Sequence, residues 1–315
     1  MELLIVTYHY IDDPRKYKAG IYPIAPEVFK IQMERISRTR KFISEEDLLA
    51  LTSGEQSFVG NLCLVTFDDG LASQARFAAP ILEKLNIPAI FFVTTQPYTS
   101  GKAATVHKIH YLLSRVPAET LKAEAEDSYK KLTGEVLNWS TENLAKAGEW
   151  YIYDDLVTAR LKYLLNHHLD SEKTDHIVDD LFVRHHKEGE AAFAEELYFS
   201  KDDLTMIKDN PLFAVGLHTH THLNIHSAPE SVVKSDITAN YSYLSEHFGM
   251  TIRGISYPYG MISETEYEKK VVTTAKELGL LYGVTTVKGI NSDLGRPFFL
   301  KRLNPNDLTS KDWLV

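Results

Sequence analysis

Three short segments of the sequence place polar side chains directly after apolar runs. They are residues 66–70 (Thr-Phe-Asp-Asp-Gly), 218–222 (His-Thr-His-Thr-His) and 257–260 (Tyr-Pro-Tyr-Gly). In parallel α/β sheets and barrels the C-terminal ends of the strands lie on one face, and binding sites are assembled there. The three segments therefore predict a single site made from distant parts of the chain.

The first segment contains two adjacent carboxylates, Asp68 and Asp69. Adjacent side chains after a strand point in different directions, so one aspartate can bind a cation while the other accepts a proton. Two negative charges this close are costly to ionise unless a cation offsets them. The alternative interpretation is the start of a helix, because Asp-Asp-Gly also suits a helix N-terminus.

The second segment alternates histidine with threonine. In an extended chain His218, His220 and His222 would share one face, whereas in a helix His218, His222 and His226 would be aligned. The periodicity does not decide between these conformations. An aspartate with two neutral imidazoles is a common ligand set for a divalent ion such as zinc and leaves a position for water. A polar loop is the alternative interpretation.

The elements that must position these residues follow from the apolar pattern. Strands are predicted at residues 3–7, 62–67, 89–93, 213–217 and 252–257, with short ones near 282–284 and 298–300. Helical patterns begin near residues 26 and 44, follow residue 70, and span about 229–248 and 263–278. Strands and helices that alternate at this spacing indicate an α/β fold with a parallel sheet.

Between residues 99 and 199 the strand signals fade, and apolar residues recur at helical spacing. We predict a helical insert over 99–199 and one α/β domain from residues 1–98 and 200–315. Adjacent histidines face different sides of a helix, so we interpret the histidines of the insert as solvated helix faces rather than a second metal site. They are His107, His110, His167, His168, His176, His185 and His186.

The composition of the 315 residues restricts the class of protein. A net charge of -9 argues against non-specific nucleic-acid binding. The only cysteine, Cys63, lies in an apolar run, so no intrachain disulfide is predicted. No apolar stretch approaches the roughly 18 residues of a membrane span, and the N-terminus lacks a signal-peptide pattern. The expected location is cytoplasmic.

The segments resemble the motifs of the NodB-type polysaccharide deacetylases, or family 4 carbohydrate esterases. Residues 66–70 are similar to the first motif and 218–222 to the second, His-Ser/Thr-x-x-His. Residues 255–260 (Ile-Ser-Tyr-Pro-Tyr-Gly) resemble the third motif in its Phe-Ala-Tyr-Pro-Tyr-Gly form, and 7–9 (Thr-Tyr-His) the Met-Tyr-His start of that branch. The resemblance covers roughly residues 1–97 and 200–303. It implies a distorted (β/α) barrel with fewer than eight strands, interrupted by the helical insertion.

The resemblance also implies roles for individual residues. Asp69, His218 and His222 would bind a divalent metal, with zinc favoured and nickel or cobalt as alternatives. Asp68 would be the general base, and the backbone N–H of Tyr259 would stabilise the oxyanion. Tyr257 and Pro258 would shape the groove, while His220 and His226 would have no ligand role.

The sequence departs from the family pattern at the proton donor. Many members supply a histidine from a C-terminal Leu-x-His motif, but no histidine follows His247. Asp68 could return its proton to the leaving amine, or His9 could serve as the acid. The alternative for His9 is a buried histidine bonded to backbone. Arg302 is a candidate to orient Asp68, with a surface salt bridge as its alternative.

The sequence thus predicts a metal-dependent hydrolase that removes an N-acetyl group from an acetamido sugar or glycan intermediate. Two alternatives stay open. One is a metal-dependent hydrolase of a small non-sugar amide, since a fold does not fix a substrate. The other is a non-catalytic glycan-binding protein, which the missing C-terminal histidine favours. The buried carboxylates count against the second alternative, because such groups are costly without a use.

Overall fold

The computed structural model describes residues 2–56, 59–139, 147–260 and 263–309, which form two compact units. The first unit consists of Met1–Asp13, Pro23–Thr99 and Glu195–Val315. The second consists of Pro14–Tyr22 and Ser100–Ala194. Within the described residues, none of the helices combines the length and the hydropathy that crossing a membrane requires.

The first unit is built on a parallel sheet with the strand order β1-β3-β4-β5-β6-β7-β8, in which a short strand, β2, also pairs with β3. The strands are β1 (Glu2–Tyr8), β2 (Lys41–Phe42), β3 (Asn61–Phe67), β4 (Ala89–Val93), β5 (Phe213–Leu217), β6 (Gly254–Ser256), β7 (Tyr282–Lys288) and β8 (Leu300–Arg302). Leu303, next to β8, exchanges backbone hydrogen bonds of 2.9 and 3.0 Å with Ile5 and Thr7 of β1. The sheet is therefore nearly closed into a barrel, which confirms the predicted fold class. Seven strands follow one another around the barrel, and β2 makes the sheet of the described residues eight-stranded, where fewer than eight strands were expected.

Alternation along the strands divides the buried residues into two sets. In β3, Cys63, Val65 and Phe67 belong to the larger apolar core, which includes residues of the surrounding helices. Leu62 and Leu64 instead belong to a smaller core with alternate residues of β1, β4, β7 and β8. Because side chains alternate between the faces of a strand, Thr66 and Asp68 continue the line of Leu62 and Leu64. The interior of the barrel is thus apolar near the strand starts and polar near the strand ends.

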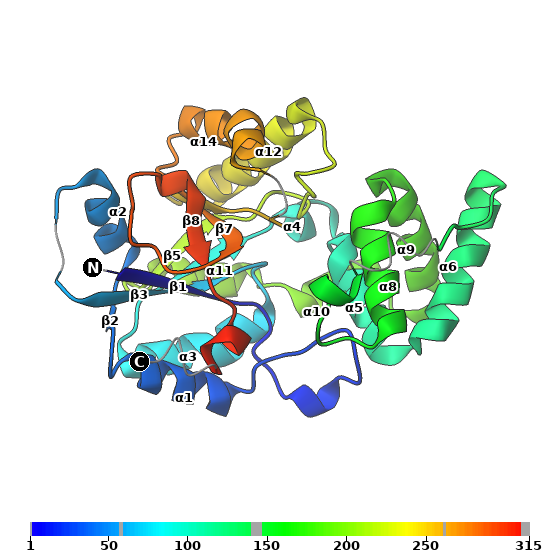
Figure 1. The fold of residues 1–315 in the computed structure, drawn as a ribbon, viewed down its shortest axis with the longest axis horizontal. Helices are drawn as coiled ribbons and strands as arrows, with labels where there is room; N and C mark the ends of the chain where they lie inside the picture. Colours follow the sequence, from blue (N-terminus) through cyan, green and yellow to red (C-terminus); the bar gives the residue numbers. More distant parts are fainter. Residues whose placement is uncertain (1, 57–58, 140–146, 261–262, 310–315) are drawn as a thin grey trace. The chain divides into compact units, whose positions relative to one another are not determined.

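Helices cover the outside of the barrel. They include α1 (Pro26–Ile36), α2 (Glu45–Ser53), α3 (Ala79–Leu85), α11 (Lys201–Asp209), α12 (Glu230–Phe248) and α14 (Thr273–Glu277). In Figure 1, α1 and α3 lie on one side of the strands, and α12 and α14 lie on the other. The helix predicted at 263–278 comprises α13 (Glu264–Tyr267), a π-helical turn at Glu268–Val272, and α14. The strand predicted at residues 252–257 is shorter in the structure, where β6 comprises only Gly254–Ser256.

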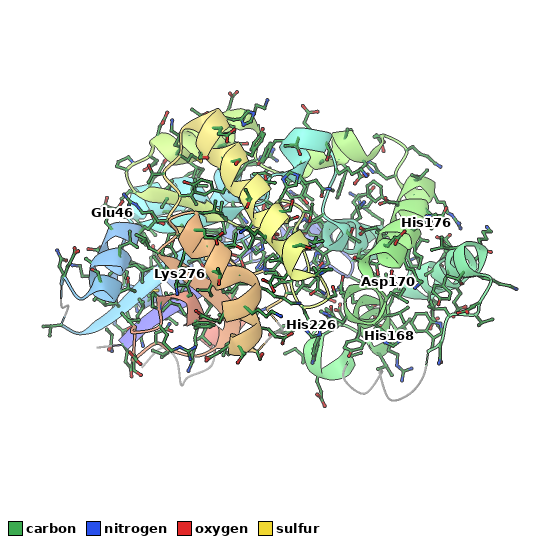
Figure 2. The ribbon with its side chains drawn as sticks, turned by 90° about the horizontal axis from the view of Figure 1, so that it is seen from above. Glu46, His168, Asp170, His176, His226 and Lys276 are labelled. Atoms are coloured by element: carbon green, nitrogen blue, oxygen red, sulfur yellow. The ribbon has the colours of Figure 1, made fainter. Side chains whose placement is uncertain are left out.

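The second unit is helical. Its elements are α5 (Thr105–Arg115), α6 (Ala118–Thr133), α8 (Leu156–Tyr163), a π-helical turn at Leu164–His168, and α9 (Ser171–His185). The helix α10 (Glu190–Leu197) begins in this unit, which ends at Ala194. Figure 2 labels His168 and His176, which come from the π-helical turn and from α9. The prediction that the histidines of the insert are solvated is wrong for His107, which is buried. His185 has its Nε2 atom 2.7 Å from a carboxylate oxygen of Glu124.

Glu45, the first residue of α2, is a buried carboxyl group in the first unit. It is 5% exposed and accepts a hydrogen bond of 2.6 Å from the Tyr282 hydroxyl. Burial raises the pKa of Glu45 to about 7, against the opposing effects of the Tyr282 hydrogen bond and of Arg253. This folded-state pKa lies above the ordinary value of 4.5. The associated stability is therefore present below about pH 4.5 and is lost as the pH rises through 7.

We expect Glu45→Gln to stabilise the protein at alkaline pH. The amide can keep the hydrogen bond to Tyr282 without a buried charge, so the variant should gain about 3 kcal/mol in unfolding free energy near pH 9 and almost nothing near pH 4.5. Urea unfolding at both pH values measures this difference. Glu46→Gln is the matched control, because Glu46 (labelled in Figure 2) has a side chain that is 72% exposed. A gain for Glu45→Gln of equal size at both pH values would contradict the assignment.

Candidate active site

The two aspartates lie where β3 ends, and both are buried. The backbone N–H of Asp68 still donates to Tyr8 of β1 at 3.0 Å, which continues the sheet pairing by one residue. Asp69 then adopts a left-handed conformation with φ 79°, and Gly70 follows with φ 69°. This turn directs the two carboxylates to different partners, and no helix begins at either aspartate.

The histidine segment is neither extended nor helical. His218 continues β5, since its N–H donates to Val93 at 3.2 Å, but Thr219 and His222 have left-handed φ angles of 59° and 55°. The resulting turn brings the Nε2 atoms of His218 and His222 to 3.2 and 3.3 Å from Oδ1 of Asp69. Both conformations considered from the periodicity are therefore wrong for this loop.

The remaining two histidines of this region lie elsewhere. His220 has its Nδ1 atom 2.8 Å from the hydroxyl oxygen of Thr95. His226, labelled in Figure 2, is an exposed residue of the loop before α12. Neither residue belongs to the cluster formed by Asp69, His218 and His222.

The donor set of that cluster suits a divalent ion. One ligand atom from each of Asp69, His218 and His222 can be chosen so that all three lie within 4.8 Å of one another, and within the described part of the chain no other such group of three occurs. His218 Nδ1 lies 2.9 Å from the carbonyl oxygen of Ser256, a contact that assigns the proton to Nδ1 and leaves Nε2 as the ligand atom. Burial disfavours protonation of His218, but Asp68 and Asp69 outweigh it and raise the His218 pKa. One carboxylate and two imidazoles fit a zinc-type ion.

Asp68 lies beside this cluster and is held by the barrel interior. Arg302 Nη1 donates to Asp68 Oδ1 at 2.8 Å, and the Ser256 hydroxyl donates to Oδ2 at 3.0 Å. Burial opposes ionisation of Asp68, but Arg302, His218 and His9 outweigh it and lower the pKa of Asp68 to about 2. Asp68 is therefore ionised at neutral pH.

Arg302 is an interior residue. It is 2% exposed, and besides Asp68 it donates to the Thr7 hydroxyl at 2.9 Å and to the Thr285 carbonyl at 2.8 Å. The alternative of a surface salt bridge is therefore wrong. These contacts connect β8 to both β1 and β3, so the same guanidinium holds Asp68 and helps to close the barrel.

His9 lies at the open edge of the site. Its side chain is 43% exposed, and its Nε2 atom is 3.9 Å from Asp68 Oδ2. The alternative of a buried histidine bonded to backbone is therefore wrong. A solvent-accessible imidazole at this distance from the carboxylate can exchange protons with solvent.

From the third motif, residues 255–260, Tyr259 contributes its aromatic ring and a strained backbone conformation to the site. The Tyr259 ring packs edge-on against His222, with ring centroids 5.1 Å apart, and Tyr259 has a left-handed φ of 60°. Tyr257 is fully buried on the outer side of the barrel, where it stacks on Tyr267 and donates to the Phe298 carbonyl. The prediction that Tyr257 shapes a groove is wrong, because strand alternation places it opposite Ser256.

Ser256 is a site residue that the sequence reasoning missed. Its hydroxyl bonds Asp68 and its carbonyl oxygen lies beside His218 Nδ1, so it contacts both halves of the site. The available signal was a polar residue between Ile255 and Tyr257 in a buried strand that ends at the predicted site.

Solved structures resemble the chain in fold. The deacetylase PplD of Streptococcus pyogenes in complex with acetate is 16% identical, with a TM-score of 0.53 over 96% of this chain and 92% of that one. IcaB from Ammonifex degensii is 18% identical, with a TM-score of 0.53 over 99% and 97%. The BpsB deacetylase domain from Bordetella bronchiseptica is 16% identical, with a TM-score of 0.52 over 96% and 95%.

Sequence comparison assigns the family. No curated protein matches the chain by sequence. The family model described as polysaccharide deacetylase matches residues 57–283, a range that contains both aspartates, both clustered histidines and the third motif. The chain therefore belongs to the polysaccharide deacetylase family.

Proposed function

We propose that the protein is a metal-dependent deacetylase that removes the N-acetyl group from an acetamido sugar or glycan intermediate. The observation that carries the proposal is the arrangement of two adjacent carboxylates. Asp69 lies 3.2 and 3.3 Å from the Nε2 atoms of two histidines, and Asp68 is held beside them by Arg302. This arrangement separates a ligand carboxylate from a carboxylate that is available for proton transfer.

In this proposal Asp69, His218 and His222 hold a divalent ion, with zinc favoured and nickel or cobalt as alternatives. When bound, such an ion supplies Lewis-acid activation of water and polarisation of the amide carbonyl. The Nδ1 contact of His218 with Ser256 fixes the ring orientation that presents Nε2 to the ion.

The protein's own groups carry the proton transfers. Asp68 is ionised because of Arg302, so it can take the proton of the attacking water. The backbone N–H of Tyr259 stabilises the charge that develops on the carbonyl oxygen. The leaving amine needs a proton, and His9, 3.9 Å from Asp68, can deliver one, or Asp68 can return its own.

The first experiment measures metal and activity together in the wild type and in Asp69→Asn. We expect nearly one zinc, nickel or cobalt per wild-type chain and acetate release from N-acetylated sugars. Both should fall at least 100-fold in the variant, because an amide oxygen is a much weaker ligand than a carboxylate. Elemental analysis and an acetate assay on the same preparations test this prediction.

A metal-free wild type that stays metal-free after zinc is added would overturn the metal site. Hydrolysis by the wild type that is faster for small cyclic or linear amides than for acetamido sugars would replace the substrate class and leave the metal site intact. The predicted cytoplasmic location belongs to the same proposal and is tested by fractionation of cells.

A further inference from the structure

The loop that carries His218 and His222 has a conformation that its own residues do not favour. Thr219 and His222 both have left-handed φ angles, and a β-branched residue such as threonine is rarely found there. Non-glycine residues keep such conformations only when surrounding contacts impose them. The contacts that hold this loop therefore decide whether the two imidazoles point at Asp69.

The N-terminal half of α12 supplies many of these contacts through Asp236. Its Oδ1 atom accepts the backbone N–H of His220 at 2.5 Å, and its Oδ2 atom accepts the Thr221 N–H at 3.2 Å and the Thr221 hydroxyl at 2.7 Å. One carboxylate thus satisfies two successive backbone donors and one side chain between the two histidine ligands. These charge-assisted bonds are among the stronger hydrogen bonds in proteins.

Asn240 lies one helical turn further along α12, on the same face as Asp236. It is fully buried, and its Oδ1 atom accepts the backbone N–H of His218 at 3.0 Å. Its Nδ2 group donates to the Val93 carbonyl at 3.1 Å and to the Thr95 hydroxyl at 3.0 Å. Asn240 therefore ties the first histidine to the end of β4.

The other side of the loop is fixed by the segment after β4. The His220 carbonyl accepts the Thr94 hydroxyl at 2.7 Å and the Gln96 N–H at 2.8 Å. The loop is therefore bonded on one side to Asp236 and Asn240 and on the other side to Thr94 and Gln96, which follow β4. Asp236 and Asn240 do not bind the metal themselves. They accept hydrogen bonds from the backbone N–H groups of His218, His220 and Thr221, which lie in the loop that carries the two histidine ligands.

We infer that Asp236 and Asn240 are positioning residues that set the metal affinity of the site by holding loop 218–222 in its left-handed turn. The inference rests on the proposed metal-dependent function. Groups that orient metal ligands typically change the affinity 10- to 100-fold when they are replaced. The helix α12 is thus a functional part of the site as well as an element of the barrel wall.

The test compares zinc affinity in wild type, Asp236→Asn and Ile237→Val by competition with a chromophoric chelator. Asp236→Asn places amide hydrogens against the loop donors, so its Kd for zinc should rise 10- to 100-fold. Ile237 is the next residue of α12 and is buried in the apolar core, so its replacement by valine lowers the melting temperature without touching the loop. Its zinc Kd should equal that of wild type.

A second variant keeps the test decisive if Asp236→Asn folds poorly. Thr221→Val removes only the 2.7 Å bond to Asp236 and should raise the zinc Kd by about 3- to 10-fold. Wild-type zinc binding with an unchanged Kd in Asp236→Asn, or in a folded Thr221→Val, would overturn the inference alone. Failure of the wild type to bind zinc would instead overturn the proposed function on which the inference rests.

Discussion

Replacement of Asp68 by asparagine is expected to lower kcat for acetate release by about 10²- to 10⁴-fold, the usual contribution of a general base. The variant should keep its metal, because Asp68 bonds Arg302 and Ser256 rather than the clustered histidines. The asparagine oxygen can still accept from Arg302, and the Ser256 hydroxyl can rotate to accept from the amide. Acetate release and metal content, measured on the same folded sample, test this prediction.

The matched comparison is Asp69→Asn, which should lose metal and activity together. Loss of metal from Asp68→Asn would assign Asp68 as a ligand instead of a base. A kcat within a factor of ten of wild type would remove Asp68 from the proton transfer altogether. Circular dichroism on each sample separates these outcomes from simple unfolding.

Replacement of Arg302 by methionine is expected to lower the free energy of unfolding by about 3–5 kcal/mol. Removal of one partner of a buried ion pair leaves the other charge uncompensated, and this is the cost that such changes typically carry. Here the remaining charge is Asp68, and the Thr7 hydroxyl and the Thr285 carbonyl also lose their partner. Urea unfolding at pH 7 measures the loss.

Two further variants identify the cause of that loss. Arg296→Met should cost less than about 0.5 kcal/mol, because Arg296 is exposed and pairs with an exposed Glu264. Adding Asp68→Asn to Arg302→Met should restore part of the stability, since the buried charge is then gone. A loss below about 1 kcal/mol for Arg302→Met, or no coupling in the double variant, would contradict the role of this ion pair.

The strands and the polar ends of the strands could be predicted from the sequence because both depend on local pattern. Buried parallel strands are short apolar runs, and β1, β3, β4 and β5 lie within two residues of the predicted ranges. The Asp-Asp and His-x-x-x-His spacings are equally local. The convergence of Asp69 with His218 and His222 could be expected only because parallel strands end on the same face.

The geometry of the histidine loop could not be predicted, because it depends on contacts from elsewhere. Left-handed residues are usually signalled by glycine or asparagine, but here they are Thr219 and His222. Bonds from Asp236 and Asn240 help to stabilise the turn, and both residues lie in a helix of which the apolar pattern predicts only the approximate range, 229–248. The prediction for Tyr257 failed for a different reason. Ser256 points into the barrel, where it bonds Asp68, and strand alternation then turns Tyr257 to the outer side.

Closure of the barrel between Leu303 and β1 has a consequence for the timing of folding during synthesis. Asp68 and its partner Arg302 are 234 residues apart in sequence, so this contact has a large loop-closure cost and a high contact order. On the ribosome, the strands from β1 to β5 can emerge and collapse before Arg302 is made. Until β8 docks, the Asp68 carboxylate lies in a forming core without the guanidinium of Arg302. The nascent chain then has neither a closed barrel nor a correctly held general base.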